Sequence, residues 1–206
     1  MVGVFHYSKS RLIGISDEIF AVVLTIMVLD IKTPISTAQG PMLDLIKHLV
    51  IYFVSFGIVS QYWVYHQELF SRIEHTTSLI TITNIYYLCF ISLTPFATSW
   101  LNDDFGHQLP TMAYSVIIIL VNLTQAIMFH EVIEIGESDG IKMSADDREE
   151  YRSAQIMLGF SLLYLLISYF APQYFLIVVI IGIALRTTVT TSARIINFIR
   201  TRRITK

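Results

Sequence analysis

The sequence predicts an all-α, polytopic membrane protein with six transmembrane helices, organised as a single domain over residues 1–206. Composition is the first reason, because hydrophobic residues make up 54% of the chain, charged residues only 15%, and mean hydropathy is +0.61. The second is that apolar residues gather in runs near the length of about 20 residues that a bilayer-crossing helix requires. This composition excludes an ordinary soluble domain, and a net charge of −2 gives no reason to expect a nucleic-acid partner.

The first apolar run, residues 11–32, carries the polar triplet Ser16, Asp17 and Glu18. A charged side chain at membrane depth costs roughly 2.5–3.5 kcal/mol on insertion scales, so such groups usually face a bundle interior, a water-filled path or a partner. In a straight helix Asp17 and Ser16 point away from one stripe of residues, which is charged at its start and apolar beyond. That stripe consists of Arg11, Ile15, Glu18, Val22, Thr25, Ile26 and Leu29.

Five further apolar runs follow at residues 43–65, 79–100, 111–130, 156–170 and 174–185. Turn-rich or charged connections separate the earlier ones, at residues 33–41, 66–77 and 101–110. The last two runs are short on apolar count, so we expect the fifth helix to begin before Ile156 and the sixth to continue past Arg186. The sequence therefore predicts six spans.

The longest polar piece is residues 131–152, which we expect to be a cytoplasmic loop, and a basic tail follows at 194–206. The order Ser144, Asp146, Asp147 within the loop is typical of a helix N-cap. Six spans put both termini on one side. Assigning that side to the cytoplasm leaves only Lys32 and Lys47 of the 14 Lys and Arg residues outside, as the positive-inside rule requires. We therefore expect a multi-pass protein of the cell (inner or plasma) membrane.

The first run also resembles a known family. Seven of its residues lie as in the R-x-x-x-F-S-D signature of the transmembrane protein 175 family: Arg11, Ser16, Asp17, Phe20, Ala21, Thr25 and Leu29. Trp63, His66, Asn84 and the pair Pro95-Phe96 are similar to the family pattern as well. Two positions depart from it, because Ile15 stands where the family usually has Phe and Glu18 where a small residue is expected.

The resemblance implies a homotetrameric, potassium-permeable channel whose first helix lines a central pore. On this reading Val22, Ile26 and Leu29 form rings that constrict the pore and gate it by dewetting, and Thr25 supplies a ring of hydroxyl oxygens. Glu18 lies at the cytoplasmic pore mouth. Alone, the stripe could equally be packing surface, and the Thr25 hydroxyl could simply bond to the carbonyl four residues earlier.

The resemblance further implies a structural polar network that holds the first helix against the next two. Its members are Arg11, Ser16, Asp17, Trp63, His66 and Asn84. The expected partners are copies of the same chain, the lipid bilayer and potassium ions. No cofactor is expected, and no metal beyond permeating K⁺, because no His or Cys cluster has metal-ligand spacing.

Two functions from other classes compete with a channel. Ser16, Asp17 and His66 include the residue types of a nucleophile and base, but nothing supplies a nucleophile elbow or an oxyanion donor set, so we do not expect an enzyme. A proton-coupled secondary transporter that uses Asp17 and Glu18 is the stronger alternative, because intramembrane carboxylates also mark proton relays.

Overall fold

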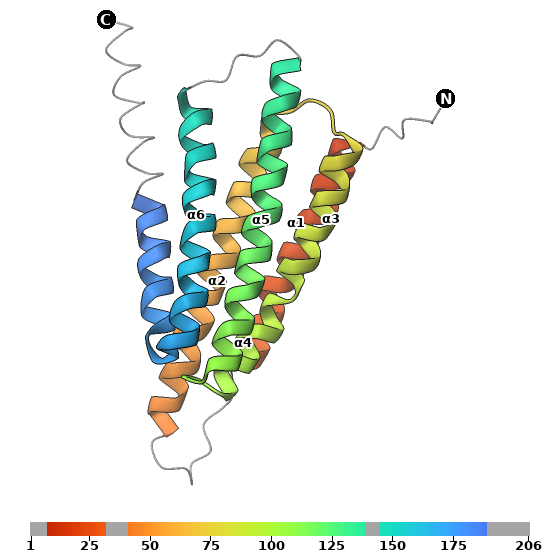
Figure 1. Ribbon diagram of the computed structural model, residues 1–206. Coiled ribbons are helices and arrows are strands. Elements are labelled where there is room, and N and C mark those ends of the chain that lie inside the picture. The colour runs from red at the N-terminus through yellow and green to blue at the C-terminus, as the bar shows by residue number, and fades with distance from the viewer. Residues whose placement is uncertain (1–7, 32–40, 139–144, 189–206) are drawn as a thin grey trace, which may run out of the picture.

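The computed structural model describes residues 8–31, 41–138 and 145–188, and these form helices and turns without strands. The elements are α1 (Lys9–Ile26), η1 (Met27–Asp30), α2 (Pro41–Ser71), α3 (Ser78–Ser92), α4 (Thr94–Asp103), α5 (Gln108–Ser138), α6 (Ala145–Phe170) and η2 (Pro172–Tyr174). From η2 a C-terminal helix continues, spanning Pro172–Thr188 in all. The helices run up and down in one elongated bundle (Figure 1).

Helix length and hydropathy match a membrane protein. In the described residues, five helical segments are long and apolar enough to cross a membrane, counting α3 and α4 as one, and Pro172–Thr188 is a shorter apolar helix. The prediction of an all-α, polytopic membrane protein is therefore confirmed, and its six spans correspond to five long helices and one shorter helix. As expected, α6 begins before Ile156 and the last helix continues past Arg186.

The third apolar run is divided between α3 and α4 at Leu93. Pro95 lies two residues later, and a proline has no N–H to bond to the carbonyl four residues earlier, so the helical ladder is interrupted there. Leu93 keeps α-helical dihedrals, φ −82° and ψ −11°, and the chain resumes as a helix at once. The two segments consequently form a single broken span.

Two predicted connections are helical over half their length or more. α2 continues through Ser71 into the stretch 66–77, and α5 and α6 extend to Ser138 and from Ala145 into the predicted loop 131–152. Hydropathy marks only the part of a helix that lies inside a bilayer. Glu, Gln and Arg are good helix formers, so the helix continues through polar sequence beyond the apolar run. The Ser144 cap and the basic tail lie outside the described residues.

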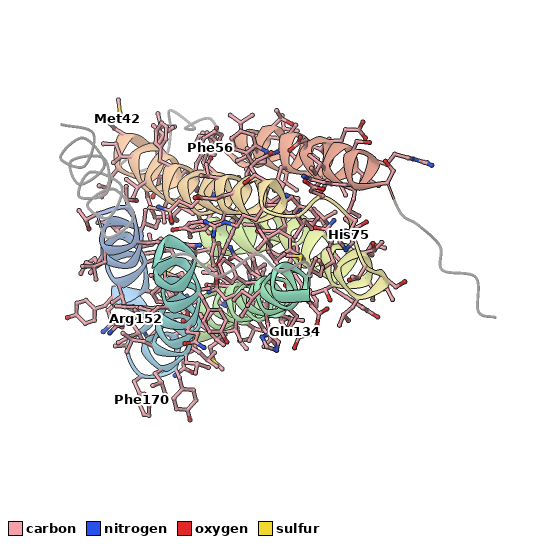
Figure 2. The ribbon with its side chains drawn as sticks, turned by 90° about the horizontal axis from the view of Figure 1, so that it is seen from above. Met42, Phe56, His75, Glu134, Arg152 and Phe170 are labelled. Carbon is pink, nitrogen blue, oxygen red and sulfur yellow. The ribbon has the colours of Figure 1, made fainter. Side chains whose placement is uncertain are left out.

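The first helix lies at one edge of the bundle and packs by one face on α2 and α3 (Figure 2). Its buried residues, Leu12, Ser16, Phe20 and Val23, recur at helical spacing and define that face. By contrast, α5 contacts α3, α4 and α6 and lies inside the bundle. The first helix therefore has a packed face and a face that the subunit itself does not cover.

Candidate functional site

The uncovered face of α1 is the stripe predicted from sequence. Glu18 and Thr25 are exposed there, and Val22, Ile26 and Leu29 have exposed fractions of 53%, 45% and 79%. The straight helix assumed for the stripe ends at Ile26, and the tighter η1 turn follows, closed by a 3.2 Å bond from Ile31 N–H to the Val28 carbonyl. Tight final turns of this kind satisfy carbonyls that a helix end leaves open.

The Thr25 hydroxyl bonds within its own helix. Its Oγ1 lies 2.9 Å from the carbonyl oxygens of both Ala21 and Val22. This is the local bond anticipated as the alternative to a role in ion contact. A hydroxyl donates one hydrogen but also has two acceptor lone pairs, so this bond orients the oxygen without preventing it from facing a cation.

Asp17 connects α1 to α2. Its Oδ1 accepts a 2.9 Å hydrogen bond from Trp63 Nε1 and a second, short one from Gln67 Nε2. Gln67 is not among the residues predicted from sequence, although it lies four residues after Trp63 and so shares its helix face. This four-residue spacing is the feature of the sequence that could have identified Gln67 as a second partner of Asp17. The carboxylate is thus held by two donors from one helix.

Ser16, His66 and Asn84 form a second set of contacts, which joins α1, α2 and α3. Asn84 Nδ2 donates to Ser16 Oγ at 3.1 Å, and Asn84 Oδ1 lies 2.8 Å from His66 Nε2. All three side chains are buried, His66 with an exposed fraction of 1%. The His66 ring also lies between Phe70 and Tyr87, with centroids 4.5 and 5.8 Å away.

The structure therefore brings together five of the six residues predicted as a polar network. Arg11 is exposed, and in the described part of the chain it makes no hydrogen bond or ion pair with the other five. At the same end of α1, Lys9 Nζ instead donates to the Ile73 carbonyl at 2.7 Å, which fastens the start of α1 to the turn after α2.

Beyond the ring contact of His66 with Tyr87, a separate series of hydrogen bonds crosses the bundle through residues that sequence reasoning missed. Tyr87 donates to the Tyr62 carbonyl at 3.1 Å, and Tyr62 donates to Asn122 Oδ1 at 3.0 Å. Asn122 Nδ2 then reaches the Met157 carbonyl at 3.3 Å on α6. The partner of each residue lies on another helix, so no local pattern indicated it.

A family of known proteins matches part of the chain. The family described as "Endosomal/lysosomal potassium channel TMEM175" matches residues 11–95, which extend from α1 into α4. This range includes the residues that join α1 to α2 and α3, namely Ser16, Asp17, Trp63, His66, Gln67 and Asn84. Over this range the chain is similar to the TMEM175 family. The family is one of ion channels, not enzymes.

Individual TMEM175 relatives extend the match along the chain. A potassium channel of a Chryseobacterium species is 29% identical over 167 residues, covering 80% of this chain and 85% of its own length. The bovine endosomal/lysosomal proton channel TMEM175 is 29% identical over 148 residues, 64% of this chain but only 31% of the relative. The crystal structure of a lysosomal potassium-selective channel TMEM175 homolog from Chamaesiphon minutus has the same fold, with a TM-score of 0.71, 18% identity, and coverage of 87% and 96% of the two chains.

The geometry offers no nucleophile–base pair among the residues considered for hydrolysis. Ser16 Oγ donates to the Leu12 carbonyl at 2.7 Å and accepts from Asn84, while His66 bonds to Asn84 and Asp17 to α2. Within the described residues no cluster of three or more His, Cys, Asp or Glu side chains could hold a metal ion. The polar groups are arranged to join helices.

Proposed function

We propose that this protein is a homotetrameric, potassium-permeable cation channel in which four copies of α1 surround a central pore. One observation carries the proposal: α1 packs by one face on α2 and α3, and its opposite, exposed face combines Glu18 and Thr25 with Val22, Ile26 and Leu29. A carboxylate on a lipid-facing surface is costly, whereas one at the mouth of a water-filled axis is not. The names of the bacterial relatives support potassium as the permeant ion.

In the proposed tetramer, Val22, Ile26 and Leu29 supply apolar rings that gate the pore by dewetting. The Val22 and Ile26 rings, four residues apart on the α-helix, would lie about 6 Å apart along the axis. Thr25, between the first two rings, supplies four hydroxyl oxygens that replace part of the hydration shell of K⁺. In the described residues no backbone loop contributes to the exposed face of α1, so selectivity would depend on these side chains.

Glu18 lies one turn before Val22 and would place four carboxylates at the cytoplasmic mouth. The orientation follows from charge, because the start of α1, the α2–α3 turn and the facing ends of α5 and α6 lie at one end of the bundle (Figure 1). That end carries Lys9, Arg72 and Arg152, so the positive-inside rule places it on the cytoplasmic side of the cell membrane. The network of Ser16, Asp17, Trp63, His66 and Asn84 would hold each pore helix in place.

The test is single-channel recording of the purified protein in bilayers, with potassium on one side and sodium on the other. Leu29→Ala should raise conductance, because it removes apolar bulk from a ring of four and lowers the dewetting barrier. Thr25→Val keeps the size of the side chain but removes the hydroxyl, and it should mainly reduce the preference for potassium. If Leu29→Ala instead lost thermal stability at unchanged flux, and Thr25→Val left selectivity unaltered, α1 would be packing surface and the proposal would be wrong.

A second candidate is proton coupling through Asp17 and Glu18, favoured by the name of the bovine relative, a proton channel. Asp17 is held by two hydrogen bonds, whereas Glu18 is exposed and better placed to exchange a proton with water. A pH gradient imposed on proteoliposomes distinguishes the candidates. Proton-coupled transport requires substrate flux to follow that gradient and to fail in Glu18→Gln, while a potassium channel conducts without it.

A further inference from the structure

Different helices hold the two ends of the proposed pore helix. At its start, Ser16 of α1 accepts a 3.1 Å hydrogen bond from Asn84 on α3. At its far end, η1 packs on α4 and α2. Because α3 and α4 are the two parts of one broken span, the two ends of the pore helix are attached on opposite sides of that break. The polar network around Asn84 accounts only for the first attachment.

Met27 makes the second attachment. It is the one buried residue of η1, with an exposed fraction of 0%, whereas Leu29 in the same turn is 79% exposed. The Met27 Sδ lies 3.9 Å from Oγ1 of Thr98 on α4, and that hydroxyl donates to the Thr94 carbonyl at 2.9 Å. Successive residues of a 3₁₀-helix are turned by about 120°, so a fixed Met27 also fixes the direction in which Leu29 points.

The break between α3 and α4 separates the two attachments. Pro95 has no N–H to donate to the Ile91 carbonyl, so one bond of the helical ladder is missing there. The Leu93 N–H bonds three residues back, to the Phe90 carbonyl at 3.2 Å. Tilting α4 against α3 at this point therefore costs fewer hydrogen bonds than bending a continuous helix, and residues at the ends of elements commonly serve as hinges.

We propose that Met27 and Thr98 are positioning residues for the ring of Leu29, the constriction farthest from Glu18. Through them α4 sets where Leu29 stands in the pore, independently of the network that holds the start of α1. The inference rests on the proposed pore but goes beyond its lining, because Met27 and Thr98 are both completely buried inside the subunit. A tilt of α4 would move the Leu29 ring and leave Val22 in place, since α1 stays bonded to α3.

The experiment measures block of potassium current by Cd²⁺ for the purified full-length protein in bilayers. The chain's one cysteine is first removed by Cys89→Ser, and Leu29→Cys or Val22→Cys is then added, so that thiolates around the axis bind the soft Cd²⁺ ion. In each of these parent channels Met27→Ala removes the attachment, and Met27→Leu keeps a side chain of similar volume. Leu12→Ala, which empties a buried position at the other end of α1, is the matched control.

We expect Met27→Ala to weaken Cd²⁺ block of the Leu29→Cys channel about tenfold, the lower end of the loss when groups that orient metal ligands are removed. Block of the Val22→Cys channel should not change. Met27→Leu and Leu12→Ala should both match the parent channel, although Leu12→Ala lowers the melting temperature through its cavity. If Met27→Ala cannot be purified, Thr98→Ala takes its place, with the same expected result.

Two kinds of result overturn the inference, and they are distinguishable. Leu29→Cys may confer block that Met27→Ala, or Thr98→Ala in its place, leaves unchanged or weakens no more than Leu12→Ala does. The pore assignment then stands and the positioning role is wrong, as it also is if block weakens equally in the Val22→Cys channel. If Leu29→Cys confers no block beyond that of Cys89→Ser alone, Leu29 does not line a pore, and the proposed function fails together with the inference.

Discussion

Replacing Asn84 with leucine should destabilise the subunit more than it alters permeation. Asn84 accepts or donates in two contacts, with His66 Nε2 at 2.8 Å and with Ser16 Oγ at 3.1 Å. His66 Nδ1 already has no hydrogen-bond partner among the described residues, so Asn84→Leu would leave both nitrogens of a buried imidazole unsatisfied. Ser16 loses less, because it still donates to the Leu12 carbonyl.

The magnitude follows from these contacts. Leaving a buried polar group unsatisfied costs about 1–3 kcal/mol, and here essentially one group, the imidazole, is affected. In membrane proteins the unfolded state also finds partners, and measured hydrogen bonds between helices average only about 0.6 kcal/mol. We therefore expect a loss of about 1–2 kcal/mol, which for a chain of this size lowers the melting temperature by about 2–8 °C.

The assay is thermal unfolding of the purified oligomer in detergent, with size-exclusion chromatography to follow assembly. Thr81→Val is the matched control, because Thr81 is buried on the same helix but bonds only to the carbonyl of Thr77. The double variant His66→Leu, Asn84→Leu should lose less than the sum of the single variants, since removing both partners leaves no orphaned imidazole. Additive losses, or Asn84→Leu melting like the wild type while ion selectivity changes, would refute the reasoning.

Three other outcomes follow from the structure. Val22→Ala should raise single-channel conductance without lowering the melting temperature, because its exposed side chain leaves no cavity in the subunit. Glu18→Gln should reduce cation entry from the cytoplasmic side at low salt and have little effect at high salt, where the Debye length falls well below about 8–10 Å; equal effects at both would contradict a mouth location. Gly182→Ala should cost about 1–3 kcal/mol of unfolding free energy through its clash with Tyr164, whereas Gly159→Ala, with open space around it, should be neutral or stabilising in thermal unfolding.

Hydropathy predicted the helices well and their ends poorly. The apolar runs correspond to the observed spans, but α2 and α5 continue into polar sequence, and the third run breaks before Pro95. The difference has a simple cause, since hydropathy reports what a bilayer accepts, while backbone hydrogen bonds decide where a helix ends. The sequence shows Pro95, but it does not show that the interruption is confined to Leu93 and that the helix resumes at Thr94.

The residues of the candidate site also fall into those that the sequence could place and those that it could not. The periodicity of one helix was enough to separate the stripe of Glu18, Val22 and Leu29 from Ser16 and Asp17, because both sets lie on a single rigid element. The partners Trp63, His66 and Asn84 could be proposed only through family resemblance, since they belong to other helices.

Only the tertiary structure could add Gln67 to Asp17, join Tyr62 to Asn122 and bury Arg186 against Tyr65. These contacts depend on which faces of separate helices meet and at what depth. Inside a bilayer an apolar run constrains that choice very little, because lipid and protein are equally acceptable neighbours for its side chains. The sequence by itself therefore determined the spans and the two faces of the first helix, while packing decided which polar groups meet.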